Sequence, residues 1–324
     1  MKIPKTTFLA TPETEAQRLL EIAIFIVNRF WQIKGFYLLP HDISDFSGQE
    51  IYFPDLKYPL SFWDEAKRLA RLKQLTMPLG TKKETLDQIV RLVPATLPEF
   101  KDIKNRWQKV EREFWQFYFA TFPGYAQKIR SVEVWVTKYD RLGSFNTNPV
   151  DIKVWIHWQA SCGDIAEGIL SSILRQKHLR DGYTWEESEA AIDNLIFNSK
   201  LHQLFPKWKP TLVGLRTNSN YALESKNYFA KLGFGGNSKL VISKLDTNLT
   251  LTEKEILKNL QNRNGAVVNF EAIGDIIWKD RAVEKYSEWA IAQTVHRLRE
   301  KIQSLGFTSE LIQTKRGEGY YLLS

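Results

Sequence analysis

Apolar side chains recur at helical spacing in three long stretches of the first part of the chain. These stretches cover residues 13–33, 61–75 and 102–122, and Pro123 closes the last of them. Apolar positions three and four residues apart form one face of a helix, which packs on a core. Aromatic rings are frequent in these stretches and dominate protein cores. The pattern therefore predicts a mainly helical, aromatic-rich region over residues 1–128.

The pattern changes to alternation in the middle of the chain. Apolar residues occupy every second position in residues 131–140 and 150–158, which is typical of strands with one buried face. Two helical stretches follow, and Asp164 and Thr184 are their predicted N-caps. Two strands followed by two helices predict a small α+β domain over residues 129–232.

Three helical stretches and a hairpin complete the chain, after a glycine-rich linker predicted at residues 233–238. In the remaining residues, 239–324, Thr252 and Asn269 are the predicted caps of the first two helices, and the third begins near Ser287. The third helix has an apolar stripe, which consists of Ile291, Val295, Leu298 and Ile302. The whole chain is therefore predicted to be a multidomain α+β protein.

The outward face of the third helix is polar and rich in groups that recognise nucleic acids. At about 100° per residue, its positions are Trp289, Gln293, His296 and Glu300, with Arg297 and Arg299 on the flanks. Amide, imidazole and guanidinium groups hydrogen-bond base edges and phosphates. The following hairpin carries Lys315 and Arg316 at a glycine-rich tip, where they either contact phosphates or only keep an exposed turn soluble. The candidate DNA-binding residues are Trp289, Gln293, His296, Arg297, Arg299, Lys315 and Arg316.

Three segments of this C-terminal part carry a family resemblance. "LTEKEILKNL", "TVHRLREKI" and "LIQTKRGEGYYL" resemble the C-terminal DNA-binding domain of response regulators of the OmpR/PhoB type. The resemblance implies a winged helix-turn-helix, with the third helix in the major groove and the hairpin, or wing, on phosphates or the minor groove. Glu300 departs from the family, which usually has a basic residue there. No phosphoacceptor receiver domain, the usual companion of this module, is evident before it.

Composition adds bounds to this picture. The chain has 324 residues and a formal net charge of +8, and a basic balance favours anionic partners. Residues 239–324 contain 13 Lys and Arg against 11 Asp and Glu, a net of +2 that is small for tight DNA binding by one copy. The lone cysteine, Cys162, excludes an intrachain disulfide and a cysteine-based zinc site. No stretch is long and apolar enough for a signal or a membrane span, so a cytoplasmic protein without membrane contact is expected.

A second resemblance concerns the middle segment. Its order of strand, turn, strand and helix is similar to that of SprT/YgjP-like zinc metallopeptidases, whose helix carries H-E-x-x-H. The corresponding positions are Ser171, Ser172, Ile173, Leu174 and Arg175, so both zinc ligands and the general base are missing. The resemblance therefore implies a pseudo-metallopeptidase, and an unrelated α+β domain is the alternative. The sequence predicts no metal, no cofactor and no catalytic residue.

The combined prediction is a DNA-binding transcription regulator rather than an enzyme. Its expected partner is double-stranded DNA, with a homodimer and contacts to the transcription machinery as further expectations. Two alternatives stay open: a hydrolase related to metallopeptidases and targeted by a winged helix, and a protein–protein adaptor. Stoichiometric zinc would favour the hydrolase, and the absence of any salt-dependent duplex affinity would favour the adaptor.

Overall fold

The computed structural model describes residues 3–43, 49–72, 79–93, 96–125, 129–140, 143–210, 219–234, 249–263, 265–279, 286–305, 307 and 311–322. Contacts divide the chain into two compact units. The first comprises residues 1–22, 35–63 and 76–225, and the second comprises residues 23–34, 64–75 and 226–324. Within the described residues, no helix combines the length and apolar character needed to cross a bilayer.

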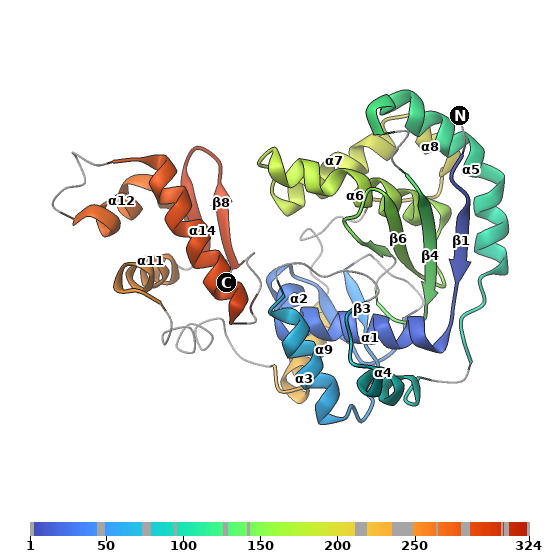
Figure 1. Cartoon of the computed structure of the whole chain (residues 1–324), viewed down its shortest axis with the longest axis horizontal. Coiled ribbons are helices and arrows are strands. Elements are labelled where there is room, and N and C mark those ends of the chain that lie inside the picture. Colours follow the sequence, from blue (N-terminus) through green and yellow to red (C-terminus); the bar gives the residue numbers. More distant parts are fainter. Residues whose placement is uncertain are drawn as a thin grey trace. The chain divides into compact units, whose positions relative to one another are not determined.

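A four-stranded sheet forms the centre of the first unit (Figure 1). Its strands lie in the order β1 (Thr6–Leu9), β4 (Ser131–Thr137), β6 (Asp151–His157) and β5 (Gly143–Phe145). The first three run parallel, whereas β5 pairs antiparallel with β6. The alternating valines and isoleucines predicted as strands are buried in β4 and β6, which the structure thus confirms as strands.

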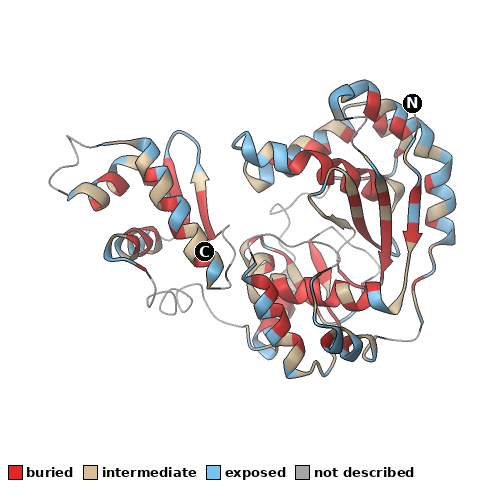
Figure 2. Cartoon of the chain, viewed as in Figure 1, coloured by how far each residue is buried: buried red, intermediate tan, exposed pale blue. Residues whose placement is uncertain are grey.

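Helices cover this sheet and share its apolar core. The long α5 (Lys101–Thr121) and α6 (Cys162–Arg180) contribute most of the helical core residues, and Figure 2 shows buried positions along β4, β6 and α6. A Cβ atom at Gly168 would lie 2.4 Å from Val154 Cγ1, so glycine lets α6 approach β6 closely. Further elements of this unit are η1 (Pro123–Tyr125), α4 (Lys83–Val90), α7 (Trp185–Phe197) and α8 (Leu201–Leu204).

The first 128 residues mix helices with strands, so the predicted mainly helical region needs correction. Strand β1 joins the main sheet, and β2 (Tyr37–Leu39) and β3 (Glu50–Tyr52) form a second, parallel pair. Strands of three or four residues are too short to produce a clear alternating pattern. The helices of this stretch are α1 (Pro12–Val27), α2 (Phe30–Ile33) and α3 (Leu60–Ala70), besides α4 and α5.

A cluster of buried charged groups joins the start of α1 to the carboxyl end of β4. Arg18 forms an ion pair with Asp140, and both side chains are at most 1% exposed. Glu15 accepts hydrogen bonds from the Lys138 backbone N–H at 3.2 Å and from the Thr137 hydroxyl at 3.2 Å. Burial raises the pKa of Glu15 to about 7, although these hydrogen bonds lower it. The cluster holds α1 across the edge of the sheet.

The described residues of the C-terminal part of the second unit form three helices and a small sheet. The helices are α11 (Leu251–Asn262), α12 (Phe270–Trp278) and α14 (Glu288–Ser304). The sheet has the order β7 (Val268–Asn269), β9 (Gly319–Leu322), β8 (Ile312–Lys315), with antiparallel pairing throughout. Its core is apolar and centres on Ile256, Leu260, Ile273, Ile291, Val295, Leu298 and Ile302. Helix α9 (Ser219–Lys231) spans the division between the two units.

Helix caps correct two details of the sequence prediction. Thr250, not Thr252, caps α11, and Ser161, not Asp164, caps α6. At each helix start several Ser, Thr, Asp or Glu side chains could serve as the cap. The sequence pattern does not fix the first helical residue, so it does not show which of them is the cap. The caps Thr184 and Asn269 are confirmed. The predicted linker lies outside the described residues from Gly235 onward, and the proposed domain boundaries remain predictions.

Candidate nucleic-acid interface

Helix α14 has one wholly buried face and one face directed away from its core. The Ser287 hydroxyl accepts a hydrogen bond from the Ala290 N–H at 3.3 Å and caps the helix, as its predicted start requires. The four residues predicted as its apolar stripe, Ile291, Val295, Leu298 and Ile302, are all 0% exposed. Because these residues fix the rotation of the helix about its axis, the polar positions of the opposite face point outward.

The predicted base-reading residues lie on this outward face. Trp289 is 73% exposed, so it does not close the core. Gln293 lies one helical turn after Trp289 and is half-buried. His296 and Arg297 are exposed. The structure therefore places an indole, an amide, an imidazole and a guanidinium along one ridge of α14, as the sequence predicted.

Arg299 differs from the other candidates because strand β8 engages its side chain. Its Nε–H donates to the Ile312 carbonyl at 2.9 Å, and its Nη2–H donates to the Thr314 hydroxyl at 2.9 Å. The guanidinium also lies over the ring of Tyr320 in β9, 5.6 Å from the ring centre. The helix and the hairpin are thus joined through one side chain.

The hairpin β8–β9 places a cationic turn at its tip. Lys315 pairs with Gly319 in register, and the turn between them carries Arg316, which is exposed. The Lys315 ammonium lies 3.0 Å from the Glu318 carboxylate, so part of its charge is neutralised within the turn. Gly317 and Gly319 have φ angles of 75° and 152°, which glycine adopts without strain.

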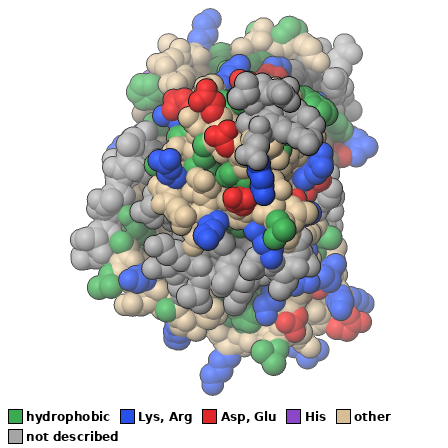
Figure 3. All heavy atoms as spheres, turned by 90° about the vertical axis from the view of Figure 1, so that its left-hand side faces the viewer, with side chains coloured by type: hydrophobic (Ala, Val, Ile, Leu, Met, Phe, Trp, Pro, Cys, Tyr) green, Lys and Arg blue, Asp and Glu red, His purple; other side chains and the backbone are tan. Residues whose placement is uncertain are grey.

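Other charges of this domain pair with one another. Lys301 Nζ lies 2.6 Å from Glu253 Oε2, which fastens α14 to the start of α11. Burial would raise the pKa of Glu253, but the Lys301 ammonium and the Thr250 N–H and hydroxyl outweigh it, and the pKa is lowered. Figure 3 shows basic and acidic side chains interspersed over the face it presents, rather than a field of one sign.

Three helices and a hairpin joined to the third helix define a winged-helix domain. The family described as "Transcriptional regulatory protein, C terminal" matches residues 244–322 of this chain. This part of the chain is thus a winged helix of the OmpR/PhoB type, which confirms the resemblance. Such a domain implies DNA as a partner and DNA binding by a transcription regulator. No curated protein and no solved structure matches the chain.

The resemblance of the middle segment to metallopeptidases has no support from these comparisons. Ser171 and Ser172, at the positions of the missing motif, are fully buried, and the Ser172 hydroxyl donates to Asn146 Oδ1 at 2.7 Å. His157 and His178 contact the Lys138 carbonyl and the Ser188 hydroxyl, respectively. Among the described residues, no group of three His, Cys, Asp or Glu side chains is arranged to hold a metal ion.

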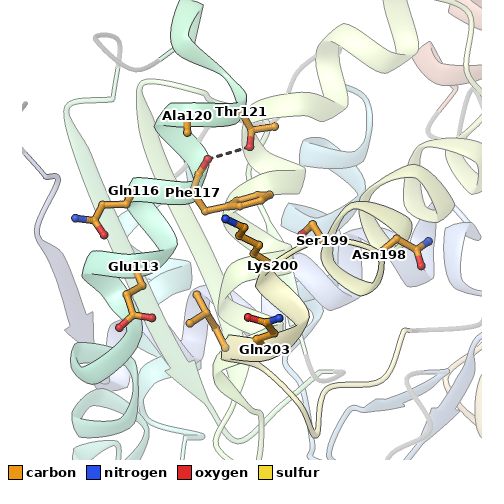
Figure 4. A pocket seen from close by; sticks show the side chains of 10 residues that line it. Glu113, Gln116, Phe117, Ala120, Thr121, Asn198, Ser199, Lys200 and Gln203 are labelled. Atoms are coloured by element: carbon orange, nitrogen blue, oxygen red, sulfur yellow. Dashed lines mark hydrogen bonds between the residues drawn. The ribbon is translucent and has the colours of Figure 1, made fainter.

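A surface pocket of about 920 Å³ in the first unit lies outside every sequence prediction. It opens between α5 on one side and α8 with the segment before it on the other, and its lining includes Glu113, Phe117 and Lys200 (Figure 4). All of its lining side chains are exposed or half-buried. Their mixture of charge, amide and apolar character indicates no particular ligand.

Proposed function

We propose that this protein is a transcription regulator whose helix α14 lies in the major groove of DNA while the hairpin β8–β9 contacts the neighbouring backbone or minor groove. The observation that carries the proposal is the exposed ridge of α14 beside a hairpin with a cationic tip. An α-helix fits the major groove, where each base pair presents its own pattern of donors and acceptors.

The ridge divides into base-reading and phosphate-binding groups. Gln293 makes the paired hydrogen bonds to adenine N6 and N7 that suit an amide, and Arg297 and His296 read guanine or bind phosphate. Trp289 supplies an apolar surface for the methyl group of thymine. Lys315 and Arg316 bind phosphates or the minor groove from the hairpin.

A single winged helix has little free positive charge, so the protein binds DNA as a dimer or with help from the first unit. Residues 239–324 carry a net charge of +2 out of +8 for the chain. Glu300 on the outward face reduces phosphate affinity further. A homodimer and contact with the transcription machinery stay predictions beside this charge argument. We infer no catalytic role and no bound metal or cofactor.

Selection of bound duplexes from a random pool by the full-length protein tests the proposal. We expect recovery of a defined sequence, with an affinity that falls steeply as salt rises. The hydrolase alternative requires stoichiometric zinc in the purified protein, which elemental content measures on the same sample. Absence of any salt-dependent duplex affinity would overturn the proposal and favour a protein–protein adaptor.

A further inference from the structure

We propose that Arg299 is a positioning residue that holds the hairpin β8–β9 against α14, so that the hairpin's DNA contacts depend on it. The inference rests on the proposed function and goes beyond it, because it assigns Arg299 to the coupling of two DNA-reading elements instead of to direct contact with DNA.

The hydrogen-bond geometry carries this inference. Two nitrogens of the guanidinium donate to acceptors two residues apart on β8, each at 2.9 Å. The planar fork of arginine presents donors in fixed directions, so both bonds fix the strand relative to the helix. The same guanidinium contacts the ring of Tyr320, which packs edge-on against Phe270 at 5.6 Å. Arg299 therefore contacts both strands of the hairpin and, through Tyr320, the core.

The hairpin needs such a connection because its sheet gives little support. Within the described residues, β8 pairs with β9 alone, and β9 is held in turn by the two residues of β7. A two-stranded hairpin alone is marginal in water. Since Arg316 lies at the far end of this hairpin, its position relative to the ridge of α14 depends on how firmly β8 is held.

Lysine distinguishes positioning from phosphate contact. Lysine keeps the positive charge but lacks the fork, so it preserves most of a phosphate contact and cannot replace two directed bonds. If Arg299 positions the hairpin, Arg299→Lys and Arg299→Gln lose the same affinity. If Arg299 instead binds phosphate, Arg299→Lys keeps nearly the wild-type affinity. Arg299→Gln then lowers the salt slope, which is the slope of log affinity against log salt concentration, by about one unit.

The experiment measures full-length protein on a duplex obtained by selection, at several salt concentrations. We expect both Arg299 variants to bind the duplex roughly tenfold more weakly, because the hairpin is held less firmly and loses part of its contact with DNA. Arg316→Ala should cost little more in the Arg299→Gln background, because the hairpin is already misplaced. The matched control is Arg263→Lys at the exposed end of α11, which is the same substitution outside the ridge and the hairpin and should bind as wild type does.

A milder variant guards against misfolding. Thr314→Val removes one acceptor of the Arg299 fork and leaves the rest of the hairpin intact. We expect duplex affinity to fall twofold to threefold, because only one of the two hydrogen bonds is removed. We also expect faster amide exchange in β8 and β9. Near-normal binding by Arg299→Lys, with unchanged exchange in Thr314→Val, would overturn the inference while the proposed function stands. A wild-type protein that binds no duplex overturns the proposed function instead.

Discussion

The first unit and the winged helix use their charged side chains in opposite ways. In the first unit, Glu15, Arg18 and Asp140 are buried together where α1 crosses the end of β4. In the winged helix, the core is apolar and the cations of α14 and the hairpin, such as Arg297 and Arg316, are exposed. The contrast teaches that the buried charges of the first unit hold its own elements together, whereas the winged helix, besides internal pairs such as Lys301 with Glu253, keeps cations exposed to a partner.

The two regions also differ in the range of their contacts. Strand β1 pairs with β4, so Thr6 lies opposite Val132. The described elements of the winged helix lie within residues 251–322, and its sheet closes over a short stretch of chain. Pairing across more than a hundred residues forms later in folding than local contacts do.

The largest expected effect concerns the buried charge of the first unit. Arg18→Met leaves the carboxylate of Asp140 buried without its cation, and we expect unfolding free energy to fall by about 3–5 kcal/mol. Chemical denaturation followed by tryptophan fluorescence measures it. The control Arg130→Met breaks an exposed pair with Asp151 and should change the unfolding free energy little by comparison. Equal effects of the two variants would contradict the proposed contrast between the regions.

The hairpin of the winged helix is the corresponding weak point of the second region. A Cβ atom at Gly319 would lie 2.0 Å from the Val268 carbonyl oxygen, so Gly319→Ala must displace β7 or the turn. We expect about 3 kcal/mol of destabilisation. Gly317→Ala is the matched control, because its Cβ would meet nothing within 4 Å and only its φ of 75° is unfavourable, a cost of about 1–2 kcal/mol. Thermal unfolding of the two variants would reveal the difference.

The internal charge of the first unit should respond to pH. Because the pKa of Glu15 in the folded protein is about 7, above its ordinary value of 4.5, its protonated form stabilises the fold at low pH. This stabilisation is fully present below pH 4.5 and is lost as pH rises through 7, a change on the order of 3 kcal/mol. Glu15→Gln should flatten this part of the stability profile, which denaturation at several pH values measures. A variant with the wild-type pH profile would refute this role of Glu15.

The ridge of α14 should act at single base pairs. Gln293→Ala is expected to cost about 1–3 kcal/mol on the preferred duplex and to relax the preference at one position. Gln261→Ala, which removes an amide from α11 instead, is the control. Repeated selection with each variant would show the change, and an unaltered sequence preference in the Gln293 variant would count against base readout.

The smallest effect is expected at the hairpin tip. Arg316→Ala should weaken binding to all duplexes alike and reduce the salt slope by about one unit. Titrations at three salt concentrations measure the slope. A loss confined to one sequence would show that Arg316 reads bases rather than phosphate.

Local patterns alone were sufficient for the winged helix. The stripe from Ile291 to Ile302 determined which face of α14 is buried, and hence that Gln293 and His296 face outward. The glycines of the hairpin and the three quoted segments identified the family. In the first unit the sequence predicted β4, β6 and several helices. It did not predict β2 and β3, because strands of three residues are too short to show an alternating pattern.

The sequence by itself determined that a basic, single-cysteine chain ends in a winged helix with a polar ridge and a cationic hairpin. Only the tertiary structure decided that β1 enters a parallel sheet, that Glu15, Arg18 and Asp140 meet inside the first unit, and that Arg299 turns to β8. The physical reason is the range of the forces. Periodicity and capping act within a few residues, whereas strand pairing and the choice of a charged partner depend on which distant segments the core brings together.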